Sequence, residues 1–151
     1  MRPFLVLISV LMFSLPAQAD GLPGSMTLQT DKPFGALVEA VNASVTANGF
    51  FVVTRASASI GASKRGVTIP GNMVIGVYRN DYAVRMLEAS VASGIEAPLR
   101  FYVTENADGT ASLTYRRPSA VFAPYDGGQA LKDMAVELDA VWQKIADGAV
   151  K

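Results

Sequence analysis

Near the carboxyl end of the chain, apolar side chains recur every three or four residues over about four helical turns. They are Leu131, Met134, Leu138, Val141, Trp142 and Ile145. This spacing gathers them on one stripe about a third of the circumference wide, opposite charged residues such as Lys132 and Asp139. Such a helix buries its stripe against another layer, most simply a sheet face. The pattern therefore predicts a layered domain with Met134 and Trp142 in its core.

Other segments supply a second helix and the strands. A second apolar stripe between Phe34 and Val45 predicts a helix, with Pro33 in its first turn and Asn48-Gly49 at its end. A short helix is expected from Asn80, with Met86, Leu87 and Val91 facing inward. Five segments alternate or are rich in β-branched and aromatic residues, as strands are: 26–30, 50–56, 72–79, 99–104 and 111–117. The predicted order is strand, helix, strand, strand, short helix, strand, strand, helix, which is an α+β domain.

Residues 97–118 predict a β-hairpin that carries several arginines and tyrosines. Asp108-Gly109 between two alternating runs is a strong signal for the turn. The same stretch contains Glu105 and Asn106, but the regular spacing and the final glutamate of a calcium loop are absent, so we expect no calcium site. Alternation places the side chains of the first arm on two faces. Leu99, Phe101 and Val103 should face the helices, and Arg100, Tyr102 and Thr104 should face away.

The first nineteen residues predict a secretory signal peptide. Arg2 precedes an apolar run from Phe4 to Leu15, and Ala17-Gln18-Ala19 provides a small-residue cleavage site. The apolar run is shorter than the roughly 20 residues that cross a bilayer, so we expect no membrane association after cleavage. The sequence predicts a periplasmic or secreted protein cut after Ala19, with a flexible segment over residues 20–25 and one domain over residues 26–148.

Composition excludes several classes of function. The chain has no histidine and no cysteine, so Ser-His-Asp and Cys-His catalysis and the usual transition-metal sites are absent. We therefore expect no metal and no cofactor, and a haem carrier that uses only Met or Tyr ligands is the least favoured alternative. Without the leader the chain has 12 basic and 13 acidic side chains. This near-neutral balance provides no basic surface for nucleic acid.

Several local strings resemble the domain of unknown function 302 family over about residues 26–148. They are "FGALVEAVNASVTANGF", "NMVIGVYRND", "GIEAPLRFYV", "ADGTASLTYRRP" and "ALKDMAVELDAVWQKIA". Exported members of that family have an Asn-Pro pair where this chain has Asn80-Asp81, and often an Asp-His pair where it has residues 56–59. The resemblance implies a fold similar to the TATA-box-binding-protein class, with an antiparallel sheet of about five strands and helices on one face. It also implies a dimer, and it brings no catalytic residue.

If the helices cover one side of the sheet, the other side needs its own explanation. The candidate ligand or interface residues expected there are Arg55, Tyr78, Arg100, Tyr102 and Arg116. Three interpretations remain open: ordinary cross-strand pairs in solvent, a homodimer interface, or a site for a small anionic or aromatic molecule. A weaker anion-site candidate is Asp126-Gly127-Gly128 at the start of the last helix, where the simpler interpretation is that Asp126 or its neighbour caps the helix.

These observations favour a non-catalytic periplasmic binding or interaction module that acts as a homodimer. The alternative is an enzyme, such as an isomerase or a lyase, that uses tyrosine, glutamate and arginine for acid-base chemistry on a small anion. A carboxyl or tyrosine with a shifted pKa in a cleft would favour the enzyme.

Overall fold

The computed structural model describes residues 21–151, so the predicted signal peptide and Asp20 lie outside the described residues. Five strands form one antiparallel sheet in the order β1-β5-β4-β3-β2. They are β1 (Ser25–Pro33), β2 (Phe51–Ala56), β3 (Asn72–Tyr78), β4 (Leu99–Glu105) and β5 (Thr110–Arg116). Consecutive strands β1 and β2 lie on opposite edges of the sheet, because the helix between them carries the chain across one face.

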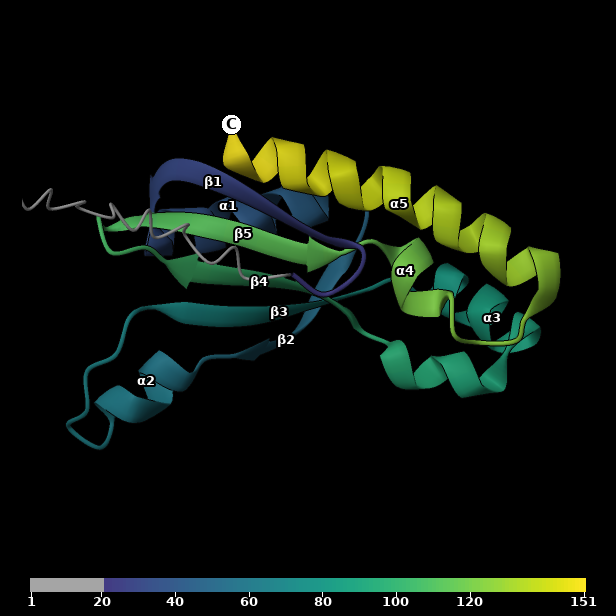
Figure 1. Ribbon diagram of the computed structural model, residues 1–151, viewed down its shortest axis with the longest axis horizontal. Coiled ribbons are helices and arrows are strands. Elements are labelled where there is room, and N and C mark those ends of the chain that lie inside the picture. Colours follow the sequence, from purple (N-terminus) through teal and green to yellow (C-terminus); the bar gives the residue numbers. More distant parts are fainter. Residues whose placement is uncertain (1–20) are drawn as a thin grey trace, which may run out of the picture.

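Two long helices, α1 (Phe34–Ala47) and α5 (Gly128–Val150), lie side by side on that face (Figure 1). The shorter helices are α2 (Ala58–Ser63), α3 (Asn80–Ala89), the 3-10 helix η1 (Val91–Glu96) and α4 (Pro118–Phe122). They lie toward the ends of the sheet (Figure 1). The predicted α+β class, the five-stranded antiparallel sheet and the packing of helices on one side are thus confirmed. No helix within residues 21–151 is long and apolar enough to span a membrane.

The core lies between the sheet and the two long helices. Trp142 of α5 is 1% exposed, and its ring stacks on Phe101 of β4 with the centroids 5.6 Å apart. Phe50 meets Trp142 edge-on at 5.5 Å. Each large apolar side chain buried in this way stabilises the fold by about 1.5–3 kcal/mol. The predicted core positions Met134 and Trp142, and the inward-facing residues of β4, are confirmed.

The boundary between β1 and α1 differs from the prediction. The strand is longer than residues 26–30, because it continues past an irregularity in register between Thr30 and Pro33. Pro33 pairs with Thr110 and is the N-cap of α1 instead of a residue of its first turn. The extended backbone of Pro33 allows it to end the strand and precede the helix.

The inward face predicted for the short helix is only partly correct. Met86 is 4% exposed, but Leu87 is 45% exposed and Val91 is 79% exposed. The helix α3 ends at Ala89, and Val91 begins η1, so Val91 does not continue the helical stripe. A ten-residue helix that packs against η1 and α5 buries a narrower face than one that lies across a sheet.

Candidate binding face

The face of the sheet opposite α1 and α5 is not covered by either long helix (Figure 1), and we call it the open face. Its members follow from the register, because residues paired across antiparallel strands project to the same side. They are Ser25, Thr27, Gln29, Phe51, Thr54, Ala56, Asn72, Val74, Gly76, Tyr78, Arg100, Tyr102, Thr104, Ser112, Thr114 and Arg116. Four of the five candidate residues lie on this face, which is made almost entirely of strand residues.

One side of the open face is apolar. This apolar half consists of Phe51, Val74, Tyr78 and Tyr102, on β2, β3 and β4. Phe51 lies opposite Tyr78, and Val74 lies opposite Tyr102. Phe51 is 66% exposed and Tyr102 is 41% exposed, while Val74 and Tyr78 are half-buried. The hydroxyl of Tyr78 donates a hydrogen bond to Asn80 Oδ1 at 3.4 Å. Large apolar side chains are therefore grouped on the sheet with little cover.

The other side of the open face is cationic. Phe101 pairs with Tyr115, so the next positions in the same register make Arg100 and Arg116 cross-strand neighbours. Both line a hollow of about 370 Å³, whose walls come from β4, β5, α4 and the chain at and before the start of β1. Arg100 Nη2 lies 3.6 Å from Glu96 Oε2, and its side chain is 62% exposed. We call Arg100 and Arg116 the arginine pair.

The fifth candidate, Arg55, does not lie with the others, and its predicted position is wrong. The register of β2 shifts between Val52 and Thr54, which leaves one extra residue in the strand. A bulge of this kind reverses the face to which the following residues project. Arg55 consequently pairs with Ile75, a core residue, and lies on the side away from Arg100. Simple alternation from Phe51 could not detect this shift.

The tyrosine next to the arginine pair also faces the core. Tyr115 is 3% exposed, and its ring meets Phe101 edge-on at 5.4 Å. Its hydroxyl donates a hydrogen bond to Gln143 Oε1 of α5 at 3.0 Å. Tyr115 is therefore a structural residue, and the tyrosine of the hairpin available to a partner is Tyr102.

The start of α5 has its N-cap at the residue after Asp126. The N-cap is Gly127, which makes no side-chain hydrogen bond, and Asp126 is exposed. Of the two positions expected to cap the helix, Asp126 and its neighbour, the neighbour Gly127 therefore occupies the N-cap position. A Cβ on Gly127 would lie 2.7 Å from Leu131 Cβ, so close packing explains this glycine. An anion site at Asp126, Gly127 and Gly128 stays a prediction.

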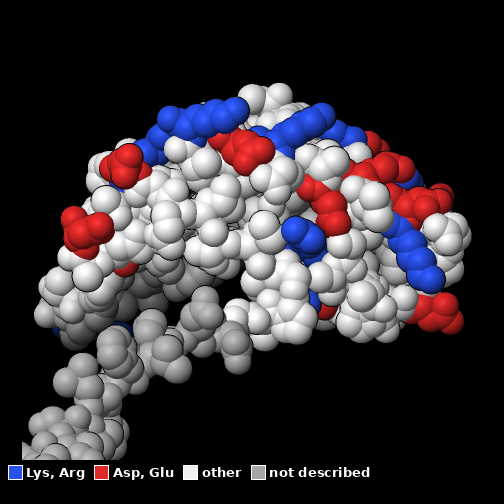
Figure 2. Space-filling model, turned by 45° about the horizontal axis from the view of Figure 1, so that its top comes forward, with Lys and Arg blue, Asp and Glu red and all other residues white. Residues whose placement is uncertain are grey.

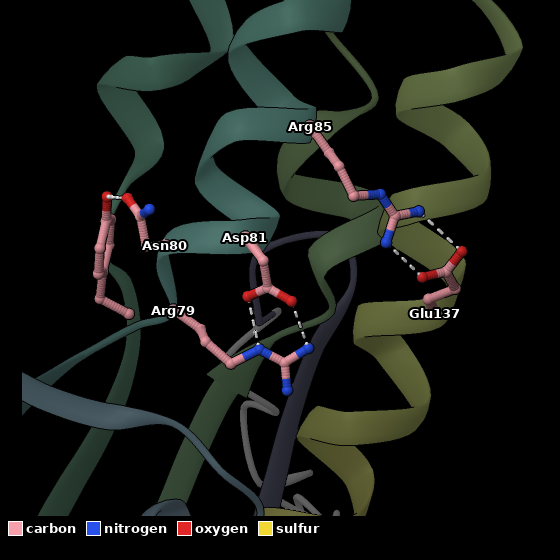
Figure 3. A network of polar contacts seen from close by, with 6 residues as sticks. Arg79, Asn80, Asp81, Arg85 and Glu137 are labelled. Carbon is pink, nitrogen blue, oxygen red and sulfur yellow. Dashed lines mark hydrogen bonds and ion pairs between the residues drawn. The ribbon is translucent and has the colours of Figure 1, made fainter.

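A network of polar and aromatic contacts at the start of α3 was not predicted, and Figure 3 shows its polar contacts. Arg79 Nε and Nη2 donate hydrogen bonds to the two carboxylate oxygens of Asp81 at 2.7 and 2.8 Å. The guanidinium also lies over the rings of Phe50 and Tyr82, 4.6 and 4.5 Å from their centroids. The hydrogen bond from Arg79 lowers the pKa of Asp81. Arg79 thus joins β3, α3 and the edge of the core.

A second ion pair in the same view connects two helices (Figure 3). Arg85 of α3 donates to both carboxylate oxygens of Glu137 of α5, each at 2.8 Å. This hydrogen bonding lowers the pKa of Glu137. The two residues are 52 positions apart, so no local spacing in the sequence could reveal their pairing.

The tyrosines with a shifted pKa, Tyr115 and Tyr125, are both raised, which does not help acid catalysis. Tyr125 donates a hydrogen bond to Glu96 Oε1 at 2.6 Å, and this bond raises the pKa of Tyr125. A raised pKa makes the tyrosine a weaker proton donor near neutral pH. The carboxyls with a shifted pKa, Asp81, Asp108 and Glu137, are all lowered, which makes them weak bases.

Charge on the face of the molecule drawn in Figure 2 is mixed. Figure 2 shows lysines, arginines, aspartates and glutamates interspersed over the face drawn. Among the residues coloured there, neither sign forms a continuous patch. This face therefore has no broad field of one sign, in contrast with the arginine pair of the open face.

Comparison with known proteins identifies the family and the fold. A family model described as "Domain of unknown function DUF302" matches residues 26–148. The crystal structure of an uncharacterized conserved protein DUF302 from Bacillus stearothermophilus is similar, with a TM-score of 0.75 and 18% sequence identity. That match covers 85% of this chain and 99% of the other. No curated protein matches this chain. The structural likeness confirms the fold and carries no activity.

Proposed function

The chain belongs to the DUF302 family, and we propose that it is a non-catalytic binding module, exported from the cytoplasm, that forms a homodimer through its open face. The observation that carries this proposal is the apolar half of that face. Phe51 and Tyr102 are 66% and 41% exposed on adjacent parts of one sheet, with Val74 and Tyr78 beside them. Exposed apolar groups of this kind mark interaction surfaces, and aromatic residues are enriched in them.

The size of the sheet suits a second copy of the chain. Five strands about 4.8 Å apart and about 20 Å long give roughly 400–450 Å² in projection. Because side chains project from the sheet, its accessible area is larger than this projected area. It therefore approaches the area of about 800 Å² that each partner buries in a standard interface. In a two-fold dimer the two subunits contact each other through the same patch. An apolar half that is complementary to itself is therefore sufficient to form the interface.

The chemistry of the described residues favours binding over catalysis. The carboxyls whose pKa is shifted are held in their ionised form by hydrogen bonds, two of them to arginines, and the pKa of Tyr125 is raised. None of these shifts produces an acid or a base near neutral pH, which the alternative acid-base enzyme would need.

Export rests on the leader predicted over residues 1–19. The test is the mass of the protein recovered from the periplasm of an expressing bacterium. We expect a chain that begins at Asp20. Recovery of the uncut chain from the cytoplasm alone would contradict the exported location.

Analytical ultracentrifugation of two matched variants tests the dimer. Phe51→Asp places a charge in the apolar half, and Val136→Asp makes the same change at a 63% exposed residue of α5 on the helix-covered side. We expect the wild type and Val136→Asp to sediment as dimers and Phe51→Asp as a folded monomer. A monomeric wild type, or a dimer that survives Phe51→Asp, would overturn the proposed interface.

A further inference from the structure

We propose that the arginine pair and its hollow bind the carboxylate of a small organic anion. This inference rests on the proposed binding function and assigns it a ligand class. The hollow of about 370 Å³ lies within the usual range for small-molecule sites. It is lined by both arginines, by Tyr102 and Thr114, and by the apolar side chains of Leu22 and Val121.

The first argument is electrostatic. Arg100 and Arg116 are cross-strand neighbours, and like charges in this arrangement repel each other. Glu96 offsets Arg100 from 3.6 Å, whereas Arg116 has no carboxylate within 4.0 Å among residues 21–151. The hollow therefore keeps about one net positive charge, which matches a monoanion.

The second argument is an unmet donor. Arg116 Nη2 donates to the carbonyl oxygen of Ala120 at 3.3 Å. Its Nε atom is buried and has no hydrogen-bond partner among the described residues. A buried donor without a partner is destabilising. This atom is closed to solvent, so the Arg116 side chain must turn toward the hollow before a bound acceptor can remove that cost. The planar guanidinium is suited to a carboxylate, because it donates two parallel hydrogen bonds.

The third argument concerns the rest of the ligand. Leu22 and Val121 give the hollow apolar walls, and Tyr102, which the hollow shares with the apolar half, also lines it. A fully hydrated inorganic anion gains nothing from these groups. A carboxylate with a short aliphatic or aromatic body would bury that body against them.

Isothermal titration calorimetry with benzoate as the probe tests this site. We expect wild-type protein to bind benzoate saturably, and to bind its neutral analogue benzamide and inorganic phosphate at least about tenfold more weakly. The Arg116→Gln variant should lose at least about tenfold in affinity, and Arg116→Lys should lose part of it, because lysine keeps the charge but not the fork. The matched control is Arg117→Gln, which removes the same charge from the next residue, one that does not line the hollow.

The outcomes separate this site from the dimer. Absence of benzoate binding, equal binding of benzamide, tighter binding of phosphate, or an equal loss in Arg117→Gln would each overturn the carboxylate site. Thermal unfolding of every variant, followed by circular dichroism, checks that the fold is retained. Benzoate binding that persists in monomeric Phe51→Asp would show that the two halves act separately, whereas a dimer without benzoate binding would reject this inference alone.

Discussion

Gly76 lies in the middle of β3, next to the edge strand β2, and its lack of a side chain has a local cause. It pairs with Arg100 on one side and with Thr54 on the other. A Cβ at this position would fall on Thr54 Oγ1 and would lie 2.9 Å from Pro98 Cγ. The glycine therefore allows two neighbouring segments to close over the middle of β3.

We expect Gly76→Ala to lower the free energy of unfolding by about 1–3 kcal/mol, because the added methyl group must displace Thr54 or Pro98. Urea unfolding followed by fluorescence of Trp142, the single tryptophan of the chain, measures this change. The control is Gly35→Ala in α1, where a Cβ would meet nothing within 4 Å. That substitution should be neutral or stabilise by up to about 1 kcal/mol. If the two substitutions changed the free energy of unfolding equally, the close approach at Gly76 would not contribute to stability.

Burial of Tyr115 should make the free energy of unfolding fall at alkaline pH. Burial raises its pKa above the ordinary value of 10.0. As the pH rises past 10, the unfolded tyrosine ionises while the folded one keeps its proton, so the free energy of unfolding falls until the folded group also ionises. Urea unfolding between about pH 9 and pH 11 should show this fall, and the fall should be shallower in Tyr115→Phe. Identical slopes in the two proteins would contradict the burial of this hydroxyl.

Residue positions on the hairpin were predictable, and those on β2 were not. Uninterrupted alternation placed Arg100, Tyr102 and Arg116 on the correct face. The apolar run from Phe50 to Val53 gives no alternation to follow, and the bulge within it moved Arg55 to the other side. The carboxylate partner of Arg100 was also missed, because Glu96 precedes the strand in a separate 3-10 helix.

At the level of elements, α4 is held to α5 by a polar contact as well as by apolar packing. The backbone N–H and the hydroxyl of Ser119 donate to the two carboxylate oxygens of Asp139 at 2.9 and 2.6 Å. This carboxylate satisfies a donor in the first turn of α4, as a capping side chain does. Pro118, Val121 and Phe122 of α4 are buried.

We expect Asp139→Ala to cost about 1–2 kcal/mol, because it leaves the first turn of α4 without its acceptor. Asp133→Ala, on the exposed surface of the same helix, should change stability by no more than about 0.5 kcal/mol. Urea unfolding of both variants provides the comparison. If both variants lost the same stability, the effect would belong to α5 and not to its contact with α4.

The long amphipathic helices were predictable because each one buries a wide stripe against a sheet. The apolar stripe of α5 alone implied a second layer and identified Trp142 as a core residue. The short helix α3 was less predictable. Its attachment depends on Met86, on stacking of Arg79 with Phe50 and Tyr82, and on pairing of Arg85 with a residue of α5. Contacts of this kind between distant residues leave no periodic signal.

At the level of the whole molecule, the helices cover one side of the sheet, and the open face has an apolar half and an arginine pair. The two halves should respond differently to salt. Dimerisation through apolar side chains should be nearly independent of ionic strength, whereas benzoate binding should weaken between about 0.05 M and 0.5 M NaCl, because screening reduces the attraction of the arginines. Ultracentrifugation and calorimetry at both concentrations measure the two effects. If the dimer dissociated at high salt while benzoate binding persisted, this result would contradict an apolar dimer interface and an electrostatic benzoate site.

The most direct test of the account is hydroxyl-radical footprinting, which reports the solvent exposure of individual side chains by mass spectrometry. Wild-type protein is compared at concentrations well below and well above its dimerisation constant. We predict that Phe51 and Tyr102 lose reactivity at the higher concentration, while Val136 on α5 and Ile95 on η1 react equally at both. Unchanged reactivity of Phe51 and Tyr102, together with protection of the helix-covered side, would contradict an interface on the open face.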